Sequence, residues 1–292
     1  MFHGSIVALV TPMEPDGAVD YAALTRLIEF HIESGSNGIV SVGTTGESPT
    51  LDHDEHCAVI EHTVRTVRGR VAVIAGTGAN ATREAIALSR CALEAGADAC
   101  LSVTPYYNKP TQEGLYRHFH GIAEAVALPL IMYNVPGRTG CDLLPSTVSR
   151  LAEIPNIVGL KEASGSIERF AELAQCCSDR LDLLSGEDPI TFEAMRLGYA
   201  RGVISVTANV APQLMFEMNQ ALLMGNVDRA RVLDDQLQPL HRALFVEPNP
   251  IPVKWALHAM GRIPAGIRLP LTPLEPAHQT SVRDPLQTAG IL

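Results

Sequence analysis

The sequence predicts an α/β fold, a (β/α)8 TIM barrel followed by a C-terminal helical extension. Eight short apolar runs rich in β-branched residues each end in or beside Gly, Thr, Pro or Asn, and helix-length stretches separate them. Continuous apolar runs of this length are typical of parallel strands that are covered on the outside. Eight strand–helix units within about 225 residues, spaced near 30 residues apart, favour a closed barrel over an open doubly wound sheet.

The predicted elements follow in chain order. The strand runs are SIVALVTP (5–12), GIVSVGTTG (38–46), VAVIAGTG (71–78), ACLSVTPYYN (99–108), LPLIMYNVP (128–136), NIVGLKEAS (156–164), LDLLSGED (181–188) and GVISVTAN (202–209). Among the helical stretches, YAALTRLIEFHIESG closes on Gly35 and REAIALSRCALEAG on Gly96, as helix C-termini commonly do. Beyond Gly225 the strand pattern stops. We therefore expect a catalytic barrel over 1–225 and a helical extension over 226–292.

Composition and charge limit the function. The chain has 292 residues, is 46% hydrophobic and carries a formal net charge of −10, which argues against nucleic-acid or anionic-membrane partners. No apolar run approaches the roughly 18–20 residues that span a bilayer, and the N-terminus lacks a basic signal-peptide region. The six cysteines form no CxxC pair. We expect free thiols and a cytoplasmic protein.

Lys161 is the residue that the barrel prediction makes conspicuous. It lies near the end of the sixth strand, in phase with Ile157 and Gly159 under the two-residue period, so its side chain is expected inside the barrel mouth. Active sites of such barrels lie at the C-terminal ends of the strands. Burial favours the neutral amine, which can attack a ketone to form a Schiff base. On position alone, a structural ion pair is an equal alternative.

Neighbouring loops supply further candidates. Tyr133 follows the fifth strand, where a phenol can shuttle protons, although buried tyrosines are often only packed. Thr44 and Thr45, in GTTGES, offer hydroxyls and backbone N–H groups for an anion, or form a tight turn. Arg138 can bind a carboxylate through two parallel hydrogen bonds, or be an ordinary surface arginine. The pair Tyr106–Tyr107 fits either a site or an interface.

Two patterns imitate cofactor or metal sites. GTGANA (76–81) resembles a dinucleotide fingerprint, but a barrel without a Rossmann half-repeat argues against a nucleotide. HDEH (53–56) lacks both the H-E-x-x-H spacing and a third zinc ligand. We expect neither a cofactor nor a metal.

Taken together, the motifs resemble the dihydrodipicolinate synthase family of the class I pyruvate-dependent aldolases. The matching segments are VSVGTTGESPTL, VIAGTGAN, VTPYYNKPTQEGLY, YNVPGRTG, GLKEASG, GVISVTAN and FVEPNPIPVKWAL. The resemblance extends over essentially the whole chain. The resemblance implies a lyase of lysine and diaminopimelate biosynthesis. It would condense pyruvate with L-aspartate 4-semialdehyde without a cofactor, as a homotetramer built as a dimer of dimers.

The resemblance also implies roles for single residues. Lys161 would carry pyruvate as a Schiff base, while Tyr133 moves protons with the help of Thr44 and of Tyr107 from a neighbouring subunit. Thr45 would hold the pyruvate carboxylate and Arg138 that of the semialdehyde. The backbone at Gly186 and Ile204 would line the pocket.

An allosteric site for L-lysine is implied as well. The matching positions are Ser48, His53, His56, Asn80, Glu84 and Tyr106. We expect Asn80 and Glu84 to share one face at the start of the helix after the third strand. The alternative is a polar subunit interface. Two departures from the family pattern, Gly137 beside Arg138 and Pro49 beside Ser48, lie in the loops concerned.

Other functions stay open at this stage. An N-acetylneuraminate lyase or a 2-keto-3-deoxy-sugar-acid aldolase would keep Lys161 and Tyr133, but it would need a long polyol pocket in place of a short site with Arg138. A non-catalytic ligand-binding relative would be expected to have lost Lys161 or Tyr133, and both are present.

Overall fold

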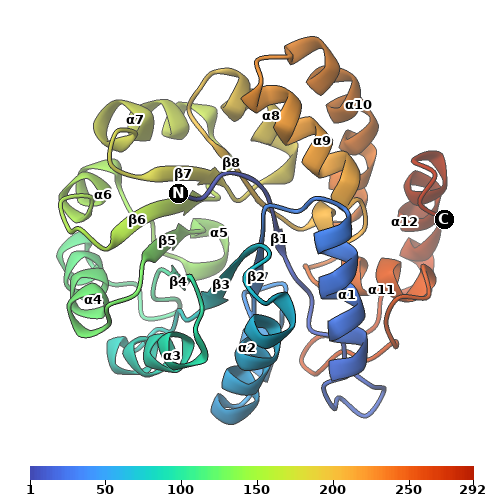
Figure 1. Cartoon of the computed structure of the whole chain (residues 1–292), viewed down its shortest axis with the longest axis horizontal. Helices are drawn as coiled ribbons and strands as arrows, with labels where there is room; N and C mark the ends of the chain where they lie inside the picture. The colour runs from blue at the N-terminus through green and yellow to red at the C-terminus, as the bar shows by residue number, and fades with distance from the viewer.

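The computed structural model describes residues 1–292 and forms a closed barrel of eight parallel strands. The strands lie at the centre of the molecule and the helices surround them (Figure 1). The strands are β1 (Gly4–Ala8), β2 (Gly38–Ser41), β3 (Ala72–Gly76), β4 (Ala99–Val103), β5 (Leu130–Asn134), β6 (Ile157–Glu162), β7 (Asp182–Ser185) and β8 (Gly202–Ser205). Each strand pairs with its successor, and β8 closes the ring on β1. The predicted fold class is confirmed.

The helices connect the strands and continue after the last one. The α-helices are α1 (Tyr21–Glu33), α2 (His53–Val67), α3 (Thr82–Ala95), α4 (Gln112–Ala125), α5 (Pro136–Thr139), α6 (Pro145–Leu151), α7 (Ile167–Cys177), α8 (Asp188–Arg196), α9 (Pro212–Leu223), α10 (Val227–Ala243), α11 (Ile251–Ala259) and α12 (Pro276–Thr288). Two short 3-10 turns, η1 (Ser48–Thr50) and η2 (Thr207–Asn209), lie in loops. Gly35 and Gly96 have the left-handed φ expected after a helix end. None of these helices is both long and apolar enough to cross a membrane.

Two apolar layers lie on the two faces of the barrel wall. The inward residues form a cluster of 13 buried side chains: Phe2, Ile6, Ala8, Val40, Ile74, Ala99, Leu101, Ile131, Tyr133, Val135, Ala163, Leu184 and Ile204. A larger cluster of 61 buried side chains fills the space between strands and helices. Successive strand residues alternate between these layers because side chains of a strand point to opposite faces. The chain therefore has one continuous wall with a filled interior.

Strand β6 departs from strict alternation. Leu130 pairs with Ile157, but the next residue, Ile131, pairs with Gly159, so Val158 is an extra residue. This irregularity turns Ile157 outward into the large cluster while Val158 packs against the barrel interior. The prediction that Ile157 is in phase with Lys161 is therefore wrong, because a bulge of this kind shifts the two-residue period. Lys161 still points inward.

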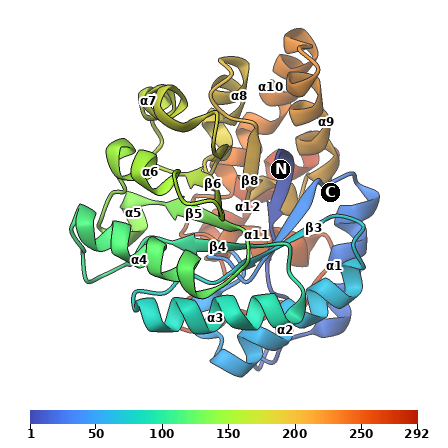
Figure 2. The same cartoon turned by 60° about the vertical axis from the view of Figure 1, so that its left-hand side comes forward.

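Three helices follow the eighth strand–helix unit. Helix α10 packs against α8 and α9, and α12 packs against α10 and α11. Figure 1 shows α9 and α10 side by side at one edge of the barrel, with α12 and the C-terminus outside them. In the rotated view, α11 is drawn behind the strands (Figure 2). Lys254 on α11 forms a salt bridge with Glu47, so these helices reach the loop that follows β2.

The cysteines do not all have free thiols. Cys57 on α2 and Cys91 on α3 form a disulfide, with Cα atoms 6.0 Å apart, while Cys100, Cys141, Cys176 and Cys177 are free. The expectation of six free thiols is wrong for this pair. The two residues are 34 positions apart and meet because α2 and α3 pack side by side around the barrel.

Candidate active site

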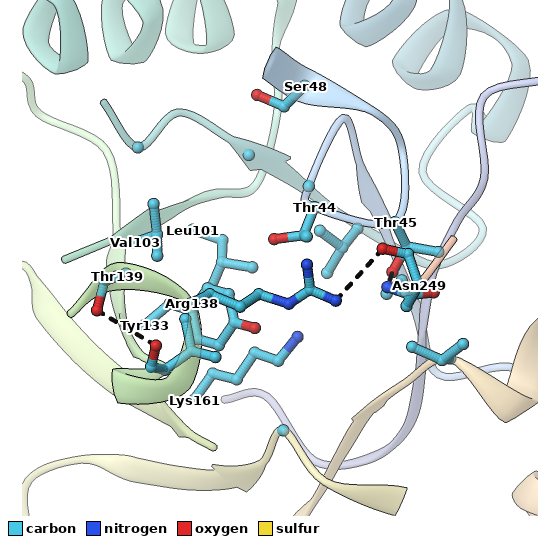
Figure 3. A pocket seen from close by; sticks show the side chains of 18 of the residues that line it. Thr44, Thr45, Ser48, Leu101, Val103, Tyr133, Arg138, Thr139, Lys161 and Asn249 are labelled. Carbon is cyan, nitrogen blue, oxygen red and sulfur yellow. Dashed lines mark hydrogen bonds between the residues drawn. The ribbon is translucent and has the colours of Figure 1, made fainter. Parts of the chain in front are cut away.

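A cavity of about 260 Å³ opens at the C-terminal ends of the strands. Lys161, Tyr133, Thr44, Thr45 and Arg138 all line it, although they come from four different loops or strands. Figure 3 shows the side chains of Lys161, Tyr133 and Arg138 reaching into the same space, with Thr44 across from them. The structure therefore brings together the residues predicted for Schiff-base chemistry. Barrel closure does this, because it places the carboxyl ends of all strands around one mouth.

Lys161 is buried and has no ionic partner. It pairs with Tyr133 on β5 and Leu184 on β7 through the sheet, and it is only 6% exposed. Its Nζ lies 4.3 Å from the centroid of the Tyr133 ring. Burial lowers the pKa of Lys161 to about 8, although the nearby Asp188 and Glu187 carboxylates oppose the shift. The alternative of a structural ion pair fits Lys254, which is paired with Glu47, rather than Lys161.

Gly186 creates room for this lysine. A Cβ at position 186 would lie 2.9 Å from Cε of Lys161 and 2.7 Å from Cβ of Ala163. Both distances are too short for packed carbon atoms. A larger residue at 186 would therefore displace the Lys161 side chain, and the role of Gly186 as a lining residue has a steric cause.

Tyr133 keeps its proton at neutral pH. It is 7% exposed, and burial raises its pKa to about 12, while Arg138 and a hydrogen bond with the Thr44 side chain act in the opposite direction. A protonated phenol beside a partly neutral amine can donate a proton to a departing oxygen and take one back. The Tyr133–Thr44 contact is the start of the predicted relay.

Thr45 and Arg138 are both tied to one residue near the C-terminus. The Asn249 side chain donates to Thr45 Oγ1 at 3.0 Å, and Arg138 Nη2 donates to the Asn249 carbonyl at 3.3 Å. Arg138 lies on the short helix α5 at the rim of the cavity. A Cβ at Gly137 would contact nothing within 4 Å, so this departure from the family pattern removes no packing.

Two of the residues predicted for catalysis or substrate binding lie outside this cavity. Tyr107 is 89% exposed, has a φ of +74° and does not line the cavity of its own chain. Ile204 is buried within the barrel, where it pairs with Ile6, and Val206 lines the cavity in its place. Ile204 was assigned by the resemblance alone; it lies within β8, which ends at Ser205, whereas Val206 lies just beyond the strand end.

The residues predicted for lysine binding are only partly brought together. Ser48 and Tyr106 both line the cavity. Burial raises the pKa of Tyr106 and the charge of Glu84 raises it further, while the backbone of Asn80 acts in the opposite direction. Asn80 precedes α3, which begins at Thr82, so the prediction that Asn80 and Glu84 share a helix face is wrong. The loop that carries Asn80 continues past the end of the strand motif.

The two predicted histidines differ. His56 is buried, and its Nε2 lies 2.7 Å from the carbonyl of Gly76, so it joins α2 to the end of β3. His53 is exposed at the first turn of α2, 3.8 Å from Cys57 Sγ. Pro49 lies within η1, where its fixed φ suits the first turn of a helix.

The glycines of GTGANA are explained by steric constraints in the fold. A Cβ at Gly76 would collide with the Val42 carbonyl, and one at Gly78 would collide with the Val103 backbone amide. Close approach of neighbouring strands and loops therefore explains the pattern that imitates a dinucleotide fingerprint.

Several lining residues were missed from the sequence. Glu187, Val206, Phe245 and Asn249 line the cavity. Glu187 is a partly buried carboxyl whose pKa is raised, first by burial and then by the neighbouring Asp188. The motif FVEPNPIPVKWAL contained the signal for Phe245 and Asn249. Nothing in the sequence alone places a residue 204 positions away beside Thr45.

Comparison with known proteins shows similarity along the whole chain. A model of the Dihydrodipicolinate synthetase family matches residues 1–289. The 4-hydroxy-tetrahydrodipicolinate synthase of Alkalilimnicola ehrlichii is 61% identical over 292 residues, which cover 100% of both chains.

Two solved structures are similar along their whole length. The chloride-inhibited dihydrodipicolinate synthase from Acinetobacter baumannii, complexed with pyruvate, matches with a TM-score of 0.98 and 54% identity, covering 100% of each chain. DHDPS from Cyanidioschyzon merolae with lysine bound matches with a TM-score of 0.96 and 40% identity, covering 100% of this chain and 99% of that one. By sequence, fold and the residues around its cavity, this chain belongs to the dihydrodipicolinate synthetase family.

Proposed function

We propose that this chain is a 4-hydroxy-tetrahydrodipicolinate synthase, a lyase of the class I aldolase type. It condenses pyruvate with L-aspartate 4-semialdehyde in the diaminopimelate and lysine biosynthesis pathway. The observation that carries the proposal is a buried, unpaired Lys161 beside a protonated Tyr133, in a cavity that also holds the Arg138 guanidinium. The names of the full-length relatives support the same activity.

The first half of the reaction activates pyruvate. A lysine of ordinary pKa is almost entirely protonated at pH 7, whereas a pKa of about 8 leaves roughly a tenth of the amine neutral. The neutral Nζ adds to the ketone carbon of pyruvate, and Tyr133 gives a proton to the oxygen that leaves as water. The Thr45 hydroxyl and neighbouring backbone N–H groups hold the pyruvate carboxylate.

The second half forms the new carbon–carbon bond. Loss of a methyl proton converts the imine into an enamine, whose carbon attacks the aldehyde of the semialdehyde. The resulting alkoxide takes a proton through Tyr133 and Thr44. The amino group of the bound semialdehyde then attacks the imine carbon, closes the ring and releases the Lys161 amine. Arg138 at the rim holds the semialdehyde carboxylate in this step.

A coupled assay tests the activity. The protein should consume pyruvate only when L-aspartate 4-semialdehyde is present, and it should not cleave N-acetylneuraminate or a 2-keto-3-deoxy-sugar acid. Turnover of either sugar acid without turnover of the semialdehyde would assign the site to another aldolase. The short cavity with its guanidinium favours the small carboxylated aldehyde.

We also infer that the enzyme acts as an oligomer. Tyr107 is an exposed aromatic residue at a left-handed φ, a backbone position that costs energy for a bulky side chain. Insertion of Tyr107 into a neighbouring subunit accounts for its exposure and completes the Tyr133–Thr44 relay. A homotetramer built as a dimer of dimers, acting in the cytoplasm, is the form we propose. Light scattering should show an assembly larger than a monomer, and Tyr107→Ala should lower turnover while Lys161 still forms its imine.

We infer feedback by L-lysine at the rim formed by Ser48, Tyr106, Asn80, Glu84 and the α2 start with His53 and His56. Glu84 can meet the ligand's ammonium groups, and the Tyr106 hydroxyl can meet its carboxylate. The adjacent Tyr106–Tyr107 pair links this rim to the relay. Calorimetry should detect lysine binding that Glu84→Ala abolishes while turnover without lysine survives. Absence of binding to the wild-type protein would leave these residues as a polar interface.

A further inference from the structure

A buried ion pair joins the C-terminal helices to the loop that carries Thr44 and Thr45. Glu47 and Lys254 form a salt bridge, with their side chains 0% and 5% exposed. Glu47 lies between β2 and η1 with a left-handed φ of +58°, and Lys254 lies on α11, 207 residues further along the chain. Burying two charges is costly unless their geometry and hydrogen bonds compensate. A buried pair at this position is therefore expected to have a structural or functional role.

The hydrogen bonds of Glu47 lead directly to the cavity. Its backbone N–H donates to the carbonyl of Thr44 at 3.1 Å, and its own carbonyl accepts from Thr50 N–H at 2.9 Å. The second carboxylate oxygen accepts the backbone N–H of Arg268 at 3.1 Å. Both oxygens of Glu47 are thus held from the C-terminal part of the chain. The loop turns around this fixed carboxylate, and Thr44 and Thr45 lie three and two residues before it.

A second contact from the same helix start reinforces the first. Asn249, five residues before Lys254, donates to Thr45 Oγ1 at 3.0 Å and accepts from Arg138 at 3.3 Å through its carbonyl. Figure 3 shows Asn249 between Thr45 and the end of the Arg138 side chain. The chain entering α11 therefore contacts residues proposed for both substrates.

We propose that Lys254 and Glu47 are positioning residues, which hold the Thr44–Thr45 loop at the height above Lys161 where it can bind the pyruvate carboxylate. The inference rests on the proposed function. It adds that the C-terminal helices are part of the pyruvate site, although neither member of the pair touches substrate. A role in stability alone is the alternative. The positioning role and the stability role differ in the expected activity of variants that remain folded. Only the positioning role predicts a loss there, because a displacement of about 1 Å in a binding group can cost orders of magnitude in rate.

Three variants separate the positioning role of the ion pair from the cost of burying an unpaired charge. Lys254→Met leaves the Glu47 carboxylate buried without its partner and is expected to be strongly destabilised. The double variant Glu47→Gln/Lys254→Met removes both charges at similar volume and should recover most of that stability. It should nevertheless need roughly tenfold more pyruvate or more for half-maximal imine formation at Lys161. Lys254→Arg keeps the charge and should stay closest to the wild-type value.

A control uses another, more exposed ion pair that links the extension to the barrel. Arg229 on α10 pairs with Glu217 on α9 at 2.9 Å, away from the Thr44–Thr45 loop. Arg229→Met/Glu217→Gln should leave the half-saturating pyruvate concentration unchanged. All measurements are made well below the melting temperature of each variant, by borohydride trapping across a range of pyruvate concentrations.

The outcomes are distinguishable. If wild-type protein traps pyruvate and the folded double variant traps it with wild-type half-saturation, the pair only stabilises the fold and the inference is wrong. If the double variant fails to fold, the folded Glu47→Asp variant, whose carboxylate is one methylene shorter, takes its place, and wild-type half-saturation in that variant would overturn the inference equally. If wild-type protein traps no pyruvate at Lys161, the proposed function itself fails, whatever the variants do.

Discussion

Three lysines in this chain occupy three different environments. Lys109 is exposed in a loop, Lys254 is buried and paired with Glu47, and Lys161 is buried without an ionic partner. Burial lowers the pKa of both Lys161 and Lys254 because it penalises the ammonium, but Lys254 is held in a salt bridge, whereas the Lys161 amine is free inside the cavity. The chemistry of the site follows from this difference in environment between identical side chains.

The lowered pKa of Lys161 has a measurable consequence. Because the pKa is about 8, the neutral fraction of the amine rises with pH, reaches one half at about pH 8 and saturates about one pH unit above that value. The rate of imine formation at limiting pyruvate should therefore rise between pH 6 and about 9 and level off above it. Cyanoborohydride trapping over that range measures the profile. A rate that keeps rising toward pH 10 would mean that Lys161 titrates like an exposed lysine.

Arg138 should separate the two substrates. The Arg138→Ala variant should still form the pyruvate imine, because Lys161, Tyr133 and Thr45 remain in place. Its condensation with the semialdehyde should weaken by about 1.5–3 kcal/mol, roughly 10- to 100-fold, which is the range for a charge-assisted hydrogen bond. Trapping and the coupled assay measure the two steps separately. An equal loss of imine formation and of condensation would mean that Arg138 binds pyruvate or stabilises the fold.

At the scale of elements, the sequence predicted every strand in the right order, but it did not predict where each strand ends or where the alternation of side chains breaks. The apolar runs extend into the loops beyond the true strand ends, because Gly, Thr and Asn at the barrel mouth continue the pattern. The β6 irregularity at Val158 was not predictable, since it depends on pairing with β5. Asn80 was wrongly placed on α3, which begins at Thr82, because nothing in the local sequence marks the loop that carries Asn80.

The disulfide between α2 and α3 was also beyond sequence reasoning. Whether Cys57 faces Cys91 depends on the rotation of two helices 34 residues apart, which only their packing determines. The expectation that was wrong followed from compartment and spacing alone.

This disulfide can be tested by counting thiols. Protein purified without reductant and then denatured should react at four cysteines, and at six after reduction. Under oxidising conditions, Cys57→Ser/Cys91→Ser should lower the free energy of unfolding by roughly 3–4 kcal/mol, the chain-entropy estimate for a loop of this length. In reductant the wild-type protein and the variant should be equally stable. Six reactive thiols before reduction would contradict the pairing.

At the scale of the whole molecule, the closed barrel explains why a large part of the candidate site could be predicted from the sequence. Closure forces the ends of β2, β5, β6 and β7 around one mouth, so residues at the strand ends in the sequence become neighbours in space. The sequence could not show what the C-terminal helices do there. Asn249 and Lys254 reach the second strand's loop across more than 200 residues, and only the folded chain reveals this contact.

The central claim is that Lys161 forms a Schiff base with pyruvate, and borohydride trapping followed by peptide mass mapping tests it most directly. The intact mass should rise by one reduced pyruvate per chain, the modification should map to Lys161, and Lys161→Ala should abolish the rise. The other two lysines, Lys109 and Lys254, serve as internal controls. A modification that maps to either of them, or no adduct at saturating pyruvate, would contradict the account.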